Sequence, residues 1–207
     1  VFFLMILRPP RSTHGVASAA SEVYKRQVES AAALADAEGL DAVTLTRVAE
    51  HLGVRQPALY RHVDNFDALI RALGLRGRGI LADRLGAAAV GMAGDDAVRA
   101  MGVAWRSMVA DHPGLYAATD RYPCATDPEL EEAVERVVEV LGQALTAYGL
   151  SDVDRVHAAR SMRSVFHGFA HLESGDGHPY ALDLDDSFNH LVDLLCAGIR
   201  QMATVPV

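Results

Sequence analysis

The residues best suited to chemistry in this chain of 207 amino acids lie close together, between positions 44 and 62. Arg55 and Gln56 can each form two hydrogen bonds with the edge of a purine base. Tyr60, Arg61 and His62 can reach phosphate oxygens. This combination predicts a surface that binds duplex DNA, and the candidate residues in this stretch are Arg55, Gln56, Pro57, Ala58, Tyr60, Arg61 and His62.

A second group of residues, in the C-terminal half, could line a cavity for a small molecule. Aromatic rings, thioethers and isolated polar groups on neighbouring helices form adaptable, mostly apolar sites. Each such residue taken singly is more typical of an ordinary core position. The group favours a medium-sized hydrophobic or aromatic ligand, and the net charge of −8 favours a neutral or cationic one. The candidates are Trp105, Met108, Tyr116, Tyr122, Met162, Phe166 and His167.

Histidines near that group raise the alternative of a metal site. His167 and His171 stand four residues apart, a spacing that places two imidazoles on one face of a helix. His178 follows closely, and Glu173 is the available carboxylate. No cysteine lies nearby, so a helix-packing role for His167 is the simpler interpretation. We therefore expect neither a metal nor another cofactor.

Catalytic motifs are absent from the sequence. It contains no phosphate-binding glycine loop, no G-x-S-x-G and no H-E-x-x-H. Cys124 and Cys196 form no C-x-x-C pair, which is typical of a reduced intracellular protein. The apolar run over residues 1–7 is too short to span a bilayer. The sequence thus predicts a cytoplasmic protein that is not an enzyme.

The candidate DNA-binding residues fall on two short predicted helices joined by a tight turn. Thr44 can cap the first helix, and Val48 belongs to its apolar face. Gly53 can adopt the positive φ of the turn, and Pro57 suits the first turn of a second helix that begins near Arg55. This is the layout of a helix-turn-helix, and the alternative is a structural corner that binds nothing.

The stretch Gly53–Val63 resembles the signature of the TetR/AcrR family of bacterial transcriptional regulators, and the similarity extends from Val28 to Leu69. Residues 111–116 and 166–168 resemble the family's effector domain more loosely. The resemblance implies an all-helical homodimer that represses a promoter until a small molecule binds. It also implies base-edge contacts by Thr46, Arg55, Gln56 and Ala58, phosphate contacts by Thr44, Tyr60 and His62, and either kind by Arg47 and Arg61.

One position departs from the family pattern. The family usually has lysine where this chain has Phe66, at the start of the fourth helix. An ammonium group there and the helix N-terminus together hold a phosphate. Because phenylalanine cannot do so, we expect weaker binding to DNA and a weaker dependence on salt.

Helical periodicity along the chain predicts an all-α protein with two domains. An N-terminal three-helix DNA-binding domain is expected over residues 28–85, with its first helix at about 28–37 and its reader motif at about 45–64. A linker helix, weakened by Gly74, Gly77 and Gly79, joins it to a ligand-binding and dimerisation bundle over residues 95–205. Residues 86–94 are rich in alanine and glycine and predict a loose connection. Residues 1–27 look like a non-native or disordered segment, and the alternative is a basic arm for the minor groove.

The last two predicted helices carry more apolar residues than one core can cover. A helix with two apolar sides must bury both, so we expect a two-fold dimer through a four-helix bundle. One seam, at a spacing of about 3.5 residues, contains Phe188, Leu191, Leu195, Ile199 and Met202. The additional apolar strips contain Val165, Leu172, Val192 and Leu194.

Three functions remain open at this point. The first is a regulator, most simply a repressor, that binds operator DNA as a homodimer and is released by a small hydrophobic effector. The second is a metal-responsive regulator that uses His167 and His171, and the third is a DNA-binding protein without an effector. A cavity on the order of a few hundred cubic ångströms in the C-terminal half would favour the first over the third.

Overall fold

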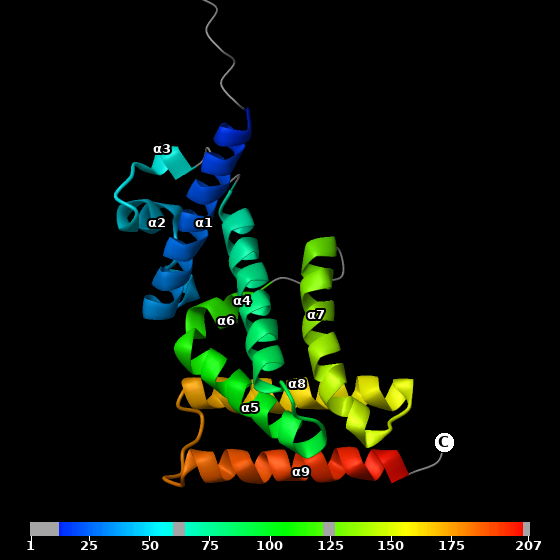
Figure 1. The fold of residues 1–207 in the computed structure, drawn as a ribbon. Coiled ribbons are helices and arrows are strands. Elements are labelled where there is room, and N and C mark those ends of the chain that lie inside the picture. The colour runs from blue at the N-terminus through cyan, green and yellow to red at the C-terminus, as the bar shows by residue number, and fades with distance from the viewer. Residues whose placement is uncertain (1–12, 60–64, 122–126, 205–207) are drawn as a thin grey trace, which may run out of the picture.

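The computed structural model describes residues 13–59, 65–121 and 127–204, and every regular element in these ranges is helical (Figure 1). None of these helices has the length and hydropathy needed to cross a membrane. The predicted all-α architecture is confirmed. The elements are α1 (Thr13–Glu38), η1 (Leu40–Ala42), α2 (Leu45–His51), α3 (Gln56–Leu59), α4 (Phe66–Ala88), α5 (Gly94–Asp111), α6 (Pro113–Thr119), α7 (Pro128–Leu145), η2 (Thr146–Tyr148), α8 (Asp152–Ser174) and α9 (Leu184–Thr204).

Local sequence signals account for the segment from α2 to α3. The Thr44 side chain accepts a hydrogen bond from the N–H of Arg47 at 3.2 Å and so caps α2, whose inner face buries Val48. Gly53 has a φ of +67°, which strains any L side chain, and it makes the turn after α2. Pro57 lies in the first turn of α3, where its missing N–H costs nothing. The described part of this segment has the predicted helix-turn-helix layout.

Helix α1 begins at Thr13, well before the start expected near Val28. The preceding residues include alanine, glutamate, lysine and arginine, which favour a helix. Ala31 and Ala35 on its inner face are completely buried, and Gly39, with a φ of +89°, follows its last turn. These small side chains let α1 lie close to α2, α4 and α6.

Helix α4 is continuous over 23 residues although it contains interior glycines. We expected Gly74, Gly77 and Gly79 to weaken it, but the first two have a packing role. A Cβ atom on Gly74 would lie 3.0 Å from the carbonyl oxygen of Ala118, and one on Gly77 would lie 3.0 Å from that of Leu115. The two glycines therefore let α4 cross the backbone of α6, and this packing outweighs their cost of about 1 kcal/mol each.

Helix α6 also lies directly against α1, a contact that sequence analysis did not predict. A Cβ atom on Gly114 would lie 1.9 Å from the carbonyl oxygen of Ala35, so only glycine fits there. The Asp36 carboxylate accepts hydrogen bonds from the N–H of Leu115 and from Nδ1 of His112, both at 2.8 Å. Residues 112–115 thus attach the C-terminal part of the chain to α1, the first helix of the DNA-binding domain.

Helix α4 extends from one part of the chain into the other. Helix α4 starts beside the reader, and its other half packs against α5, α6 and α7 (Figure 1). Residues 86–94, which we expected to form a loose connection, are the last turn of α4, a short turn and the start of α5. Alanine favours helix there, so α4 itself is the connection between the two parts.

Aromatic side chains from three helices form the centre of the C-terminal part. Trp105 of α5, Phe166 of α8 and Phe188 of α9 are at most 2% exposed. The rings of Trp105 and Phe166 lie 6.0 Å apart, and those of Phe166 and Phe188 lie 6.4 Å apart. A Cβ atom on Gly102 would lie 2.8 Å from the Phe166 ring, so the glycine makes room for this cluster.

Helices α8 and α9 run antiparallel at the base of the molecule (Figure 1). The apolar seam of α9 was expected to pack on a partner, but its Ile199 is 2% exposed and belongs to the core of the single chain, as does Val192 of the second strip at 1%. Leu172 and Leu194, in contrast, are 48% and 72% exposed. The rotation of α9 about its axis decides which apolar strip is buried, and periodicity alone does not fix that rotation.

Candidate functional site

The described residues of the reader motif present several side chains to solvent. Thr46 on α2 is exposed, and Arg55 is exposed immediately before α3. Gln56 is half-buried and Pro57 is exposed in the first turn of α3. Contacts of these residues with bases remain a prediction. Tyr60, Arg61 and His62 lie outside the described residues. Of Ala58, only the backbone is described.

Thr44 and Arg47 are both engaged within the protein. Thr44 caps α2, as described above. The Arg47 guanidinium binds the carboxylate of Glu38 at the end of α1 and donates to the carbonyl oxygen of Ala42 at 3.4 Å. The hydrogen bond with Glu38 raises the pKa of Arg47. Arg47 therefore braces α2 against α1, and a phosphate contact by this side chain would compete with Glu38.

The start of α4 lies beside the start of α2. Asn65 caps α4 by accepting a hydrogen bond from the N–H of Ala68 at 2.8 Å. Phe66 is 38% exposed and borders a hollow that Thr44 and Ile70 also line. The first turn of α4 therefore lies next to the cap of the reader, and it carries a phenyl ring where the resemblance predicts an ammonium group.

A cavity of about 310 Å³ lies in the C-terminal part, among α4, α5, α6, α7 and α8. Trp105 and Tyr116 form part of its wall. This volume lies at the lower end of the range for small-molecule sites, roughly 300–1,000 Å³. Most of its remaining lining is aliphatic and includes Leu81, Val134, Val137, Leu141, Val156 and Ala159.

Charged side chains occupy two places in this cavity. Arg78 of α4 is 6% exposed and donates to the carbonyl oxygen of Thr119 at the end of α6. Arg160 and Arg163 of α8 are exposed and therefore stand where the cavity opens to solvent. The carboxylate of Asp120 lies 3.8 Å from the Arg163 guanidinium. No motif in the sequence marks these arginines, although Arg160 and Arg163 share a helix face with Val156 at a spacing of three and four residues.

The residues that the sequence nominated for a ligand site fall into separate groups. Trp105 and Tyr116 line the cavity. Met108, Met162 and Phe166 are completely buried and lie in the core rather than at the cavity. Two others remain: His167, which contacts Tyr116 behind the cavity wall, and Tyr122, which lies outside the described residues.

A chain of hydrogen bonds leads from the cavity wall to α8. Trp105 Nε1 donates to the Tyr116 hydroxyl oxygen at 2.8 Å, and this hydroxyl lies 2.8 Å from His167 Nδ1. Burial raises the pKa of Tyr116 above its usual value of 10, so the phenol keeps its proton. Since the indole is only a donor, the phenol oxygen accepts from it, and the same hydroxyl forms the second hydrogen bond with the imidazole of His167.

The histidines considered as metal ligands have other contacts. The rings of His167 and His171 stack with centroids 5.8 Å apart, and the His178 ring packs on Phe169 at 4.9 Å. Glu173, the carboxylate available to such a site, instead binds the Arg106 guanidinium through both carboxylate oxygens. Within the described ranges, no three His, Cys, Asp or Glu side chains gather as a metal site.

Comparison with known proteins decides the family. Residues 28–73 match the profile of the bacterial regulatory proteins of the tetR family, and residues 98–195 match that of the tetracyclin repressor-like C-terminal domain. The chain belongs to the TetR family. This TetR-family protein is a DNA-binding transcriptional regulator of the helix-turn-helix type, as the resemblance predicted.

Relatives of this TetR-family chain extend over nearly its whole length. It is 34% identical over 198 residues to the uncharacterized HTH-type transcriptional regulator Rv0681 of Mycobacterium tuberculosis. The matched region covers 95% of this chain and 90% of the relative. It is 27% identical over 176 residues to YobS of Bacillus subtilis, another HTH-type transcriptional regulator, with 84% and 91% covered. The similarity therefore includes both the reader and the C-terminal part.

Solved structures show the same fold. The transcriptional regulator SCO7222, a TetR from Streptomyces coelicolor, superposes with a TM-score of 0.67 at 22% identity, covering 87% of this chain and 98% of that one. A TetR from Acinetobacter baumannii in complex with minocycline gives a TM-score of 0.63 at 23% identity, covering 86% and 97%. The arrangement of a small reader on a helical C-terminal bundle is thus that of the family.

Proposed function

We propose that this protein is a repressor that binds a palindromic operator as a homodimer and leaves it when a small molecule enters the cavity. The observation that carries the proposal is that one helix belongs to both sites. Helix α4 contributes Arg78 and Leu81 to the cavity lining, and its first residue, Phe66, lies beside the cap of the reader. A ligand that displaces the cavity wall would therefore displace the base of the reader. The minocycline complex of a structural neighbour also supports a ligand in this fold.

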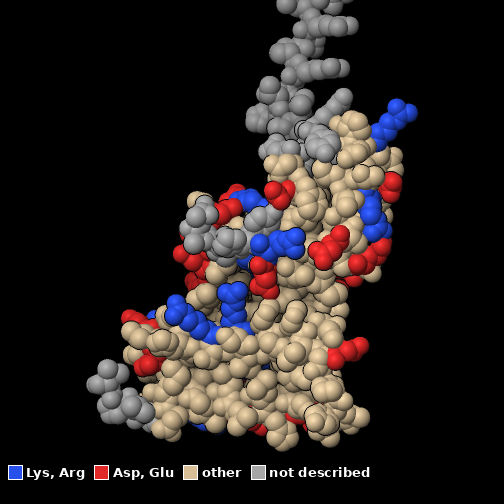
Figure 2. Space-filling view, turned by 180° about the vertical axis from the view of Figure 1, so that it is seen from behind, with Lys and Arg blue, Asp and Glu red and all other residues tan. Residues whose placement is uncertain are grey.

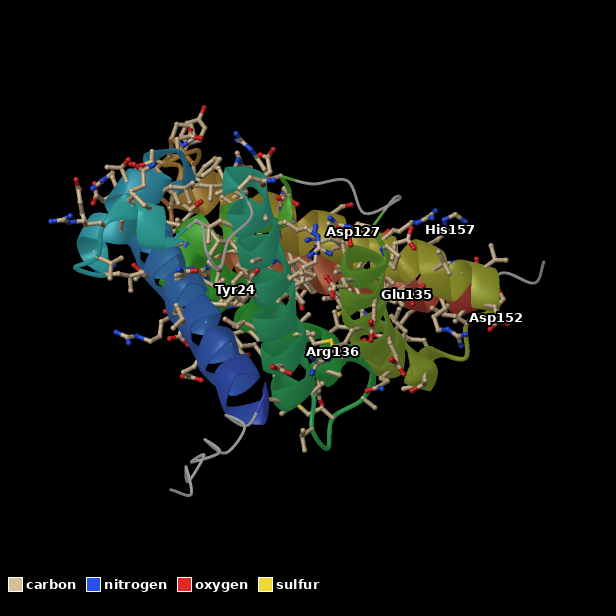
Figure 3. All side chains as sticks on the ribbon, turned by 90° about the horizontal axis from the view of Figure 1, so that it is seen from above. Tyr24, Asp127, Glu135, Arg136, Asp152 and His157 are labelled. Atoms are coloured by element: carbon tan, nitrogen blue, oxygen red, sulfur yellow. The ribbon has the colours of Figure 1, made fainter. Side chains whose placement is uncertain are left out.

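Ion pairs between α4 and α7 support coupling across the cavity. The Arg71 guanidinium binds both carboxylate oxygens of Asp127 at the N-terminus of α7, and Arg136 binds Asp83, two residues after the cavity residue Leu81 of α4. Figure 3 shows Asp127 and Arg136 on the side of α7 that faces α4. Because these pairs span the cavity walls, a change in the spacing of α4 and α7 must stretch or exchange them.

Ligand binding releases DNA only if the ligand prefers the arrangement that does not fit DNA. A tenfold loss of operator affinity requires about 1.4 kcal/mol of such preference, and tight binding by itself contributes nothing. The contacts of α6 offer a second route, since α6 lines the cavity through Tyr116 and touches α1 through Gly114. Movement of α4 or α6 would change the position of the reader helices in the DNA grooves.

The outward face of α8 and α9 supports the homodimer. On α8 this face carries the half-buried Gly168 and the exposed Leu172, and on α9 it carries the exposed Leu194 and Gly198. Glycines let a partner helix approach closely, and leucines supply apolar area. Figure 2 shows the base formed by these helices as a broad surface with few charged side chains. A second copy of the chain would cover this face in a four-helix bundle.

The experiment begins with in vitro selection of operator duplexes by the purified protein. Small molecules are then screened for loss of binding to the selected duplex. We expect at least one compound to release the DNA. The variant Ala159→Phe, which adds a ring to the cavity wall, should need at least about tenfold more of that compound while its operator affinity stays within a few fold.

The matched control is Ala110→Phe, which adds the same ring at an exposed position of α5 outside the cavity. It should respond to the compound like the parent protein. A compound that releases DNA equally well from Ala159→Phe would show that it acts elsewhere. Failure of selection to enrich any duplex would contradict operator recognition itself.

A further inference from the structure

The charge at the cavity is opposite to the charge of the whole protein. The chain has 27 acidic and 19 basic side chains and a net charge of −8. Among the described residues that line the cavity, three are arginines, Arg78, Arg160 and Arg163, and one, Asp120, is acidic. The local excess of positive charge lies against mostly aliphatic walls, where an ion interacts more strongly than it does in water.

Arg160 differs from the arginines around it. Other arginines near the cavity bind carboxylates, for example Arg136 with Asp83 and Arg155 with Asp152. Within the part of the chain that the structure describes, no carboxylate lies within ion-pair distance of the Arg160 guanidinium. A nitrogen of the Arg163 guanidinium lies 3.8 Å from a carboxylate oxygen of Asp120, which is longer than a hydrogen bond. The N–H groups of Arg163 can therefore also bind an anion. Two guanidinium groups are thus available one helix turn apart at the opening of an apolar cavity.

We infer that the cavity takes a monoanionic amphiphile, with its anionic group bound at the opening by Arg160 and Arg163 and its apolar body between α4 and α7. Planar guanidinium groups bind a carboxylate through paired, charge-assisted hydrogen bonds. Leu81, Val137 and Leu141 then cover the apolar body. This inference rests on the proposed function, since it takes the cavity to be the effector site. It reverses the expectation of a neutral or cationic ligand that the net charge suggested.

The size of the cavity limits the length of the ligand. The volume of about 310 Å³ is at the lower end of the range of roughly 300–1,000 Å³ for small-molecule sites, so a small ligand suits this cavity. Octanoate is such a ligand and has one carboxylate. Octan-1-ol and octylamine have nearly the same shape as octanoate. At neutral pH octan-1-ol carries no charge and octylamine carries a positive charge. The three compounds therefore separate the effect of charge from that of apolar burial.

The protein carries its own probe for this test, because Trp105 is the single tryptophan of the chain and lines the cavity. Octanoate, octan-1-ol and octylamine are titrated in turn into the full-length protein while Trp105 fluorescence is recorded, with calorimetry as a second readout. We expect octanoate to bind at least about tenfold more tightly than octan-1-ol, as charge-assisted hydrogen bonds warrant. Octylamine should bind most weakly, and high salt should reduce the differences.

The variants Arg160→Gln and Arg163→Gln should each reduce the preference for octanoate over octan-1-ol at least about threefold. The matched control, Arg155→Gln, changes a half-buried arginine of the same helix that does not line the cavity, and it should keep the preference. Equal or tighter binding of octan-1-ol, no binding of octanoate at millimolar concentration, or an unchanged preference in Arg160→Gln would each overturn the inference.

The same titrations keep this inference separate from the proposed function. Octanoate binding that depends on Arg160 but leaves operator affinity unchanged would support the anionic site and contradict its role in release. Release of operator DNA by a neutral compound that binds in the cavity, with octanoate inactive and unbound, would support the effector function and overturn the anionic ligand.

Discussion

The indole N–H of Trp105 on α5 donates a hydrogen bond to the phenol oxygen of Tyr116 on α6, at 2.8 Å. The two rings meet edge-on, with centroids 6.4 Å apart and planes at 73°. Trp105 is 2% exposed and Tyr116 is 5% exposed, so water is poorly placed to substitute for either partner. The bond therefore holds the cavity wall together at a point where its loss leaves a buried donor unpaired.

Tyr116→Phe should lower the free energy of unfolding by about 1–3 kcal/mol, because the indole N–H loses its acceptor while the ring keeps its packing. Urea unfolding at a fixed protein concentration measures the change. The control is Tyr180→Phe, which removes a hydroxyl from a side chain that is 80% exposed and should change little. Equal stability of Tyr116→Phe and the parent protein would mean that the hydrogen bond contributes nothing net.

Arg55→Ala should weaken binding to the selected operator by about 1–3 kcal/mol and relax the preference at one base pair, because Arg55 is exposed where the reader helix begins. Fluorescence anisotropy with the operator and its single-base-pair variants measures both effects. Arg155→Ala, a change on α8 far along the chain, is the control and should bind like the parent protein. An equal loss on every duplex would assign Arg55 to a phosphate instead.

Phe66→Lys should strengthen binding to all duplexes alike, because it adds an ammonium group at the N-terminus of α4 where the phenyl ring is 38% exposed. The slope of log affinity against log salt should steepen by about one counterion per subunit. Titrations over a series of salt concentrations test this, with Phe66→Leu as the uncharged control. The same slope in both variants would show that a lysine at this position does not reach the backbone.

Leu194→Glu should convert the proposed dimer to monomers and abolish tight operator binding, since a palindromic site needs two DNA-binding motifs at a fixed separation. Leu194 is 72% exposed in the single chain, so a charge there leaves the monomer core intact. Val90→Glu, at a position 77% exposed in the turn between α4 and α5, is the control. Light scattering measures the mass of each variant, and a dimer that persists in Leu194→Glu would move the interface to another face.

Asp127→Asn tests the contact between α4 and α7 through its dependence on pH. The hydrogen bond from Arg71 lowers the pKa of Asp127 from 3.8 to about 2. A carboxyl group whose pKa falls on folding stabilises the protein above its unfolded pKa, and that stabilisation is lost as the pH falls from 3.8 to about 2. Asparagine still caps α7. The difference in unfolding free energy between the parent protein and Asp127→Asn should therefore shrink over this pH range. A constant difference would contradict a stabilising contact between Arg71 and the Asp127 carboxylate.

The sequence by itself determined the reader and the family. Thr44 as a cap, Gly53 in the turn and Pro57 in the first turn of α3 act through residues a few positions away, so their effect on the backbone does not depend on the rest of the fold. The same local pattern carries the family resemblance. For this reason the helix-turn-helix, the all-α class and the regulatory function could all be predicted.

Tertiary structure alone decided the cavity and the surfaces that helices share. Arg78 and Arg160 are far apart in the sequence, and they line one cavity only because α4 and α8 pack around α7. Helical periodicity marked Val192 and Leu194 as apolar, but only the rotation of α9 buried the first and exposed the second. Which face of an amphipathic helix meets a neighbour depends on the balance of all its contacts, and that balance is a property of the folded chain.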